Sequence, residues 1–427
     1  MAVSGRVETG RDMQGIWANR EFRFYLASVT VQRFAASALL VLLGYQVYAL
    51  RKEPLDLAAL GLAEALPGIT LVLYGGHLAD ILNRRRIVIV CAAALALLAA
   101  GLALASATGP TLGFLLAVAV AAASVKAFQT PATTGLEAQV LPVEQIFAGI
   151  PYIAMANRSA DIVGPVAMGF VWAAAGPAAA YAILAGLFAL VLGAVSFGIA
   201  PKPTPEKPAQ PVGAVTAIRE GIAFVFGNQV LVGSMALDLF AVFFGGAAAL
   251  LPVFATDILH VGPTGFGLLR AAAAAGSLTA ALAATRFLPK AHAGLALHAI
   301  IAGFGLSMIV FGLSESFLLS LAALFASGLC DGMSVVIRQS IVRLASPEHL
   351  RGRIAAVRMV FIGSSNELGA VESGLAAAWL GPARAVWAGG VVTLAVVAAV
   401  SRTAPRLVAL DLNTFGRNAA PVTPARA

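Results

Sequence analysis

The sequence predicts an all-α membrane protein in which twelve transmembrane helices form two pseudo-symmetric six-helix bundles. Three observations support this prediction: the composition, the length of the apolar runs, and a repeat that relates the two halves of the chain. Of the 427 residues, 60% are hydrophobic and 11% are charged, and the mean hydropathy is +0.90. Soluble domains carry roughly 45–50% apolar and about 25% charged residues. A water-soluble fold of this length could not bury so much apolar surface, so we expect the chain to fold in lipid.

Apolar runs of about 18 residues or more predict membrane-spanning helices, and such runs follow one another along the whole chain. Glycine and proline mark tight turns between several of them, as in ATGPTLG, AAGPAAA and LGPARA. The predicted helices cover residues 22–50, 55–79, 86–106, 111–130, 146–174, 177–200, 229–256, 263–286, 292–313, 316–344, 351–380 and 383–401.

The longest polar connection lies between the sixth and seventh predicted helices. Residues 201–221 are rich in Pro, Lys and Glu, which predicts a solvated linker, and a short amphipathic segment follows near Ile218–Phe226. We expect the tail after Arg402 to be unanchored. The predicted organisation is an N-terminal cytoplasmic segment (1–21), a six-helix bundle (22–200), a cytoplasmic linker with a short amphipathic helix (201–228), a second six-helix bundle (229–401) and a cytoplasmic tail (402–427).

Basic residues are distributed unevenly between the two sides of the predicted membrane. Nineteen fall in loops and termini on one side, and only Arg51, Lys52 and Arg384 on the other. Because basic loops stay in the cytoplasm, we expect both termini there, in a cell inner membrane. The charged N-terminal segment has no apolar core, so no cleaved signal peptide is expected. These loops account for the net charge of +8 better than nucleic-acid binding does, and the isolated Cys91 and Cys330 predict neither a disulfide framework nor a metal site.

Short matches at a nearly constant spacing indicate an internal repeat. GLAEA at Gly61 parallels GLLRA at Gly267, an offset of 206 residues. An offset of 205 relates Gly164 to Gly369 and Gly169 to Gly374. An even number of helices per repeat gives both halves the same orientation, with the substrate site expected between them near mid-membrane. Three related positions carry opposite charges, which suits ion pairing between the halves: Glu64 and Arg270, Asp80 and Arg286, and Lys126 and Asp331.

The stretch LVLYGGHLADILNRRRIVIV, residues 71–90, concentrates charge between two apolar runs. Its pattern resembles the signature loop between the second and third helices of the major facilitator superfamily, whose members have twelve helices in two six-helix halves. The matching residues are Gly76, Asp80, Arg84, Arg85 and Arg86. Ile81 and Asn83 stand where that family usually has a basic residue and a glycine.

This resemblance implies a latch on the cytoplasmic side that governs switching between access states. We expect Gly76 to let a neighbouring helix approach closely, and Asp80 to accept hydrogen bonds from a facing helix or to pair with an arginine. The alternative is that the arginines serve only to keep this loop in the cytoplasm.

The segment ADIVGPVAMG, residues 160–169, resembles the antiporter motif of drug-exporting members of the family. Gly164, Pro165 and Gly169 fit the motif, whereas Ala160 and Met168 replace two of its glycines. Proline removes a backbone donor and bends the helix, and glycine permits close packing. An ordinary packing seam of small residues is the alternative explanation.

Further segments, including GYQVYAL, GLAEALPG and SSNELGAVESG, are similar to those of exporters of the enterobactin-exporter type, also called transmembrane secretion effectors. The similarity implies a monomer that extrudes siderophores, drugs or other small hydrophobic compounds, driven by protons and without a cofactor or bound metal. Its expected partners are the small-molecule substrate, protons and the lipid bilayer. An importer on the same fold is the first alternative. A non-transport intramembrane enzyme is the second, but the chain shows no reactive constellation and no phosphate-binding loop.

Ionisable residues inside the predicted spans are the strongest candidates for function, because a charge at mid-bilayer costs about 2.5–3.5 kcal/mol. The basic ones are Arg33, Lys126, Arg158, Arg270, Arg338 and Arg358, and the acidic ones are Glu64, Asp161, Asp238, Asp331, Glu367 and Glu372. They are expected to face one another or a hydrated cavity. Near a helix end, Lys126 and Arg338 could instead extend to the membrane surface.

Glu64 is the first candidate for proton coupling, because it is expected at mid-membrane on a span bent by Pro67. Asp238, Asp161 and Glu367 follow, with Arg158 close enough to Asp161 for a local pair. The alternative role for each is a fixed ion pair that holds the fold together. Polar and aromatic side chains expected to line the substrate path are Gln32, Tyr45, Gln46, Asn157, Phe240 and Asn366.

Overall fold

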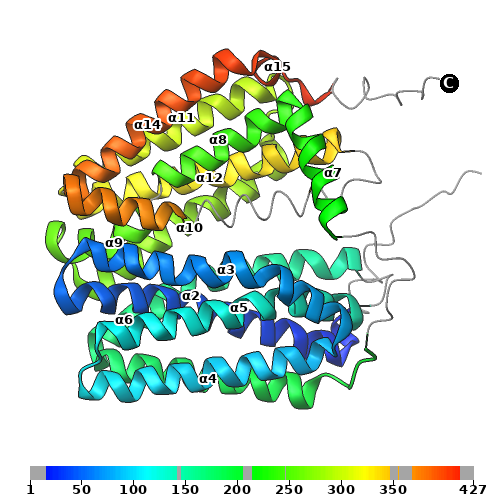
Figure 1. Cartoon of the computed structure of the whole chain (residues 1–427), viewed down its shortest axis with the longest axis vertical. Coiled ribbons are helices and arrows are strands. Elements are labelled where there is room, and N and C mark those ends of the chain that lie inside the picture. Colours follow the sequence, from blue (N-terminus) through cyan, green and yellow to red (C-terminus); the bar gives the residue numbers. More distant parts are fainter. Residues whose placement is uncertain are drawn as a thin grey trace, which may run out of the picture. The chain divides into compact units, whose positions relative to one another are not determined.

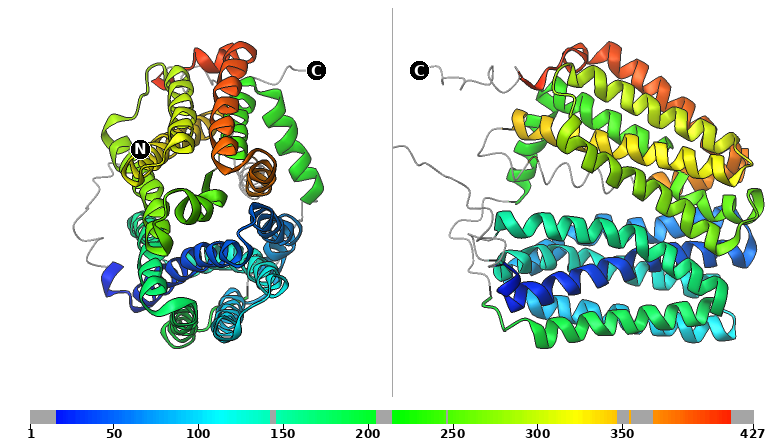
Figure 2. Two further views of the ribbon diagram at one scale, coloured as in Figure 1. Left: turned by 90° about the vertical axis from the view of Figure 1, so that its left-hand side faces the viewer. Right: turned by 180° about the vertical axis from the view of Figure 1, so that it is seen from behind.

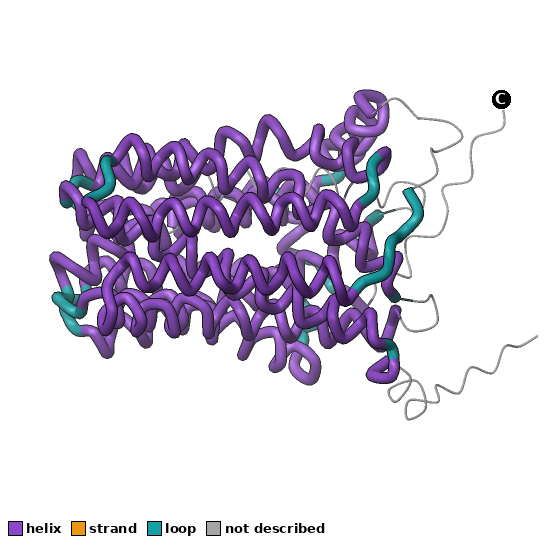
Figure 3. The backbone as a smooth tube through the Cα atoms, turned by 90° about the horizontal axis from the view of Figure 1, so that it is seen from below, coloured by secondary structure: helices purple, strands orange, loops and turns teal. Residues whose placement is uncertain are grey.

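The computed structural model describes residues 16–141, 146–204, 214–245, 247–346, 354 and 368–413. These residues are almost entirely helical, and none of them lies in a strand (Figure 3). The chain forms two compact units. Unit 1 contains residues 1–50, 63–208 and 263–267, and unit 2 contains residues 51–62, 209–262 and 268–427.

Unit 1 is built from long apolar helices (Figure 1). They are α2 (Arg20–Arg51), most of α3 (Pro54–Ile81), α4 (Arg84–Thr108), α5 (Leu112–Val140) and α6 (Ile146–Gly198). Gly176 has a φ of 80°, outside the helical range, and so divides α6 into two spans at the turn that the sequence predicts. Tyr25, Leu136 and Val195 lie in the core of this unit. The helix α5 continues ten residues beyond its predicted end because Pro131 does not interrupt it.

Unit 2 contains the remaining elements. They are α7 (Ala214–Gly227), α8 (Gln229–Gly245), η2 (Ala247–Leu250), α9 (Leu251–Val253), η3 (Phe254–Ile258), most of α10 (Gly262–Phe287), α11 (Ala293–Leu313), α12 (Phe317–Ala345), the helix Leu368–Leu380, α14 (Pro382–Thr403) and α15 (Pro405–Val408). The helix α7 covers the short segment predicted after the linker. The predicted span 229–256 is broken by 3-10 and π turns around Pro252. The helices α8, α11 and α14 pack together, as two views in Figure 2 show.

Ten helices in the described part of the chain are long and apolar enough to cross a membrane. One of them, Gly149–Gly198, is 50 residues long and contains the break at Gly176, so it supplies two spans. The shorter apolar helix Leu368–Leu380 forms the end of the span predicted at 351–380. The predicted class, an all-α membrane protein of this architecture, is confirmed.

The sequence repeat is visible in the way the helices cross. In unit 1, α6 and α10 approach closely at two glycines. A Cβ on Gly169 would lie 2.9 Å from the carbonyl oxygen of Pro263, and a Cβ on Gly267 would lie 2.9 Å from that of Pro165. Such distances leave no room for a side chain, so glycine is required at both positions.

Unit 2 contains the equivalent crossing, between α3 and the helix Leu368–Leu380. A Cβ on Gly61 would lie 3.0 Å from the Cβ of Ala370, and one on Gly374 would lie 2.6 Å from the Cβ of Ala58. Gly61 and Gly267 are related by the predicted offset, as are Gly169 and Gly374. A third related pair follows the same rule, with Gly164 packed on Phe34 of α2 and Gly369 packed on Phe243 of α8.

The segment after α14 is anchored, so the prediction of a free tail after Arg402 is wrong for residues 403–412. Leu407 and Leu410 are buried in the core of unit 2. The N–H of Gly294 donates to the carbonyl of Leu410 at 3.1 Å, and the N–H of Leu412 donates to the carbonyl of Lys290 at 2.9 Å. The leucines in RLVALDL were the available signal, since a solvated tail has no use for apolar residues at this density.

Candidate functional site

The loop between α3 and α4 holds unit 1 together at one end. The guanidinium of Arg84 donates to the carbonyls of Ala79 at 3.0 Å and Gly135 at 3.1 Å, and lies 3.5 Å from the carboxylate of Asp80. Arg85 donates to the carbonyls of Ser196 at 2.6 Å and Ile199 at 2.9 Å, at the end of α6. These two arginines therefore satisfy carbonyl groups at the ends of three helices.

The close helix approach predicted for Gly76 occurs one residue earlier. Among the residues that the structure describes, a Cβ on Gly76 would meet nothing within 4 Å, whereas a Cβ on Gly75 would collide with the backbone of Ala127 and Phe128 on α5. One step along a helix turns a side chain by about 100°, so only one of two adjacent glycines can face a given neighbour. Arg86 is exposed at the surface.

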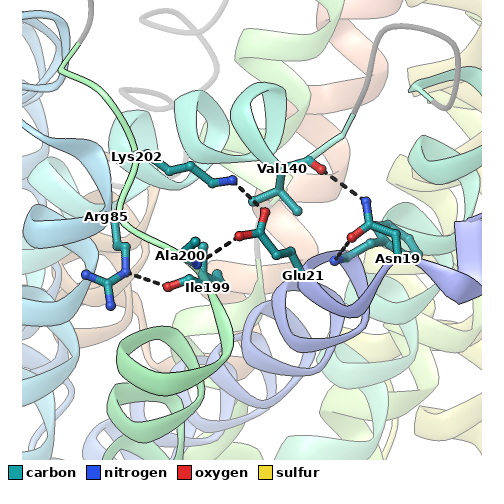
Figure 4. Close-up of polar contacts among 8 residues, drawn as sticks. Asn19, Glu21, Arg85, Val140, Ile199, Ala200 and Lys202 are labelled. Atoms are coloured by element: carbon teal, nitrogen blue, oxygen red, sulfur yellow. Dashed lines mark hydrogen bonds and ion pairs between the residues drawn. The ribbon is translucent and has the colours of Figure 1, made fainter.

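Asn83 adds contacts that a glycine at this position could not make. Its side chain accepts a hydrogen bond from the N–H of Arg86 at 3.1 Å, which caps α4, and donates to the carbonyl of Lys202 at 2.5 Å. Lys202 pairs with Glu21 at the start of α2 at 2.5 Å, and Glu21 also accepts from the N–H of Ala200 at 2.8 Å (Figure 4). The loop, the start of α2 and the first residues of the linker are thus joined in one polar network.

Near the middle of the unit 1 helices, Arg33 on α2 and Asp161 on α6 form a bidentate ion pair. The two N···O distances are 2.6 Å and 2.9 Å. Asp161 therefore pairs with Arg33 of another helix and not with Arg158 of its own. The Arg33 side chain is 53% exposed, and that of Asp161 is 20% exposed.

Two further cations lie at the same level of unit 1. Lys126 and Arg158 are both exposed. Lys126 is at the centre of α5, so the alternative that it extends from a helix end does not apply. We call the group of Arg33, Lys126, Arg158 and Asp161, carried by α2, α5 and α6 of unit 1, the cationic face.

Unit 2 carries an acidic counterpart, formed by Asp238, Asp331 and Arg338. Arg338 on α12 is 9% exposed and pairs directly with Asp238 on α8, which is 12% exposed. A second guanidinium nitrogen lies 3.9 Å from Asp331, whose side chain is 44% exposed. The same guanidinium also donates to the carbonyl and the hydroxyl of Ser334. Arg338 is therefore a buried cation shared by two carboxylates, and it does not extend to the membrane surface.

Of the other predicted charges, Glu64 on α3, Arg270 on α10 and Glu372 on the helix Leu368–Leu380 are half-buried. Glu64 and Arg270 both have interaction partners. Arg358, Asn366 and Glu367 lie outside the described residues.

The predicted path residues divide into packed and accessible ones. Gln32 donates to the side chain of Gln129 on α5 at 3.1 Å, beside a cavity of about 40 Å³ inside unit 1. Gln46 is buried and donates to Ser106 at 2.9 Å. Tyr45 is buried between Trp172 and Phe266. Asn157 is half-buried and Phe240 is 40% exposed, so these two remain accessible.

The match to a family model decides the identity of this fold. Residues 25–370 match the model described as Major Facilitator Superfamily. The chain belongs to the major facilitator superfamily. As a member of this family, it is a multi-pass membrane transporter.

Individual relatives are distant. The chain is 27% identical, over 323 residues, to the "Multidrug efflux pump Tap" of Mycobacterium tuberculosis (strain ATCC 25618 / H37Rv), covering 73% of this chain and 76% of that protein. Among solved structures, a bacterial homologue of the human lysosomal transporter Spinster matches with a TM-score of 0.69 at 15% identity, covering 95% and 99% of the two chains. A POT family transporter in complex with 5-aminolevulinic acid matches with a TM-score of 0.72 at 12% identity, covering 91% and 97%. At these identities the structures establish the fold alone.

In this member of the superfamily, the antiporter-like motif makes two helix contacts at once. Gly164 faces the carbonyl of Phe34 on α2, and Gly169 faces that of Pro263 on α10. Ala160 and Met168, which replace motif glycines, are both buried. These glycines therefore make close helix contacts, as both explanations of the motif require, and a role in transport direction stays a prediction.

Proposed function

We propose that this transporter is a proton-coupled exporter of small hydrophobic or amphipathic compounds, siderophores among them, that works by alternating access. We place it in the cell inner membrane with both termini in the cytoplasm. The likeness to Tap, which is named a multidrug efflux pump, supports the outward direction. An importer of a small organic solute is the second candidate, because a nucleoside transporter and peptide transporters share the fold.

The observation that carries the proton coupling is the sharing of Arg338 by Asp238 and Asp331. Two carboxylates beside one guanidinium repel each other, and a proton on one of them removes that repulsion. Asp238 is buried and contacts the guanidinium of Arg338 directly. Asp331 is the more distant and more exposed partner, so it is the group from which a proton can be exchanged with water.

The other acidic candidates have less support as the coupling group. Asp161 is bound by Arg33 through both of its carboxylate oxygens, so its negative charge is already paired with one guanidinium. Glu64, the first candidate from the sequence, remains in the proposal as the group to be compared with Asp331.

Transport into inverted membrane vesicles with an acidic interior tests this proposal. Amphipathic dyes of negative, neutral or positive charge serve as trial substrates. We expect a transported dye to accumulate inside the vesicles, and a protonophore to abolish that accumulation. Asp331→Asn should remove the dependence of accumulation on the proton gradient, whereas Asp161→Asn should keep it. Normal gradient-driven accumulation by Asp331→Asn, together with its loss in Glu64→Gln, would move the coupling site to Glu64. Dye transport only toward the cytoplasmic side of the membrane, which is the outside of inverted vesicles, would favour the importer.

A further inference from the structure

The cationic face has three basic side chains, Arg33, Lys126 and Arg158, and one acidic side chain, Asp161. We propose that this face binds a negatively charged group of the transported compound through Lys126 and Arg158, so that the substrate class is an amphipathic organic anion. The inference rests on the proposed transport function and specifies its ligand.

Contacts at one level of unit 1 bring the three helices of this face together. Helix α2 contacts α5 through the hydrogen bond between Gln32 and Gln129, and contacts α6 through the ion pair between Arg33 and Asp161. Because Gln32 and Arg33 are adjacent, α2 lies between α5 and α6 at this level.

Lys126 and Arg158 both lie one helical turn from these contacts. Gln129 is buried against α2, and Lys126, three residues earlier, lies about 60° around the helix and is exposed. Arg158 precedes Asp161 by three residues, so the two side chains leave α6 from neighbouring positions.

The carboxylate of the cationic face, that of Asp161, is already paired with Arg33. Asp161 offers one oxygen to each of two Arg33 nitrogens, at 2.6 Å and 2.9 Å. Within the part of the chain that the structure describes, no carboxylate pairs with Lys126 or Arg158. Each therefore lacks a carboxylate partner among the described residues and lies near the middle of a spanning helix, where a lone charge costs about 2.5–3.5 kcal/mol. An anionic group on a ligand would offset this cost, because an ammonium and a guanidinium offer charged donors and no acceptor.

An apolar strip continues the face along α2. Ala36 and Leu40 follow Arg33 at spacings of three and seven residues, which places all three on one side of the helix. Ala36 is exposed, and Leu40 is 37% exposed. A ligand that fits this surface joins an anionic group to an apolar body. The acidic cluster lies on other helices, so the proton and the anion are bound by separate groups.

Equilibrium binding to the purified full chain in lipid nanodiscs tests this inference without a proton gradient. The probes are naphthalene-2-carboxylate, its neutral amide and naphthalene-2-methylammonium, which share one ring system and differ in charge. We expect the carboxylate to bind most tightly. Lys126→Gln and Arg158→Gln should each weaken its binding by roughly tenfold, as expected for loss of a charged donor, and leave the amide unchanged. The matched control is Arg402→Gln, which removes one positive charge at the end of α14 and should bind like the wild type.

Several results would overturn the inference. They are equal binding of the carboxylate and the amide, preference for the ammonium, no binding of the carboxylate, or wild-type carboxylate affinity in the double variant Lys126→Gln/Arg158→Gln. Unchanged amide binding and an unchanged unfolding temperature show that a variant is folded. If the carboxylate binds as expected but no proton gradient moves it, the proposed proton coupling fails and the anion site stands.

Discussion

At the residue scale, the free energy of unfolding depends on whether each buried charge keeps its partner. Arg338 and Asp238 lie almost entirely out of solvent and contact each other directly. Removing one partner of a buried pair leaves the other charge uncompensated, which costs about 3–5 kcal/mol. We therefore expect Arg338→Gln to lower the free energy of unfolding by about that amount, measured by denaturant titration in mixed micelles. The double variant Asp238→Asn/Arg338→Gln should recover much of the loss, and a double variant as unstable as the single one would contradict this account of the pair.

Asn83 allows a second test, because it caps α4 and also holds the linker. Asn83→Ala should lose about 1 kcal/mol for the cap and a further ~1 kcal/mol for the hydrogen bond to Lys202. Thr111→Ala is the matched control, since Thr111 caps α5 through the N–H of Phe114. Equal destabilisation of the two variants in the same titration would show that the contact with Lys202 adds nothing.

The sequence predicted which residues carry charge inside the membrane but not how they pair. Arg158 is three residues from Asp161, so proximity along the chain favoured that pair. In the structure Asp161 pairs instead with Arg33, which lies on another helix and 128 residues away in the sequence. A single sequence carries no signal for such a contact. The choice between Gly75 and Gly76 failed for a similar reason, because helical phase must be known to within one residue.

At the element scale, the repeat was predictable because its glycines are required by backbone contact. The four positions Gly61, Gly169, Gly267 and Gly374 stand at equivalent crossings in the two units. At all four positions an added Cβ would lie only 2.6–3.0 Å from an atom of the facing helix, which favours glycine in both halves where other positions differ. The broken end of α8 and the anchored segment after α14 were missed, because both depend on tertiary packing and not on apolar periodicity.

Helix α6 offers a direct test of the glycine crossing. Gly169→Ala places a Cβ 2.9 Å from the carbonyl oxygen of Pro263, so the helices must shift, at a cost of about 1–3 kcal/mol. Gly193→Ala lies in the same helix, and no described residue comes within 4 Å of the added Cβ, so this variant should gain up to ~1 kcal/mol from helix propensity. Thermal unfolding of the two variants should change in opposite directions. A stabilised Gly169→Ala would contradict the crossing.

At the scale of the whole molecule, the charge asymmetry predicts the orientation in the membrane. With nineteen basic residues on one side and three on the other, both termini should lie in the cytoplasm. Fluorescent-protein fusions that mature only in the cytoplasm should therefore fluoresce at either terminus. Fusions of a periplasm-dependent phosphatase at the same sites should be inactive, and an active phosphatase at either terminus would reverse the topology.

The most direct test of the central claim measures proton movement by the purified protein. Proteoliposomes with an acidic lumen and a trapped pH dye should lose luminal protons when an amphipathic substrate is added outside, and should accumulate that substrate at the same time. Asp331→Asn should take up substrate only to equilibrium and release no protons. Substrate accumulation in the wild type without any proton flux, or the same flux in Asp331→Asn, would contradict proton-coupled export through the acidic cluster.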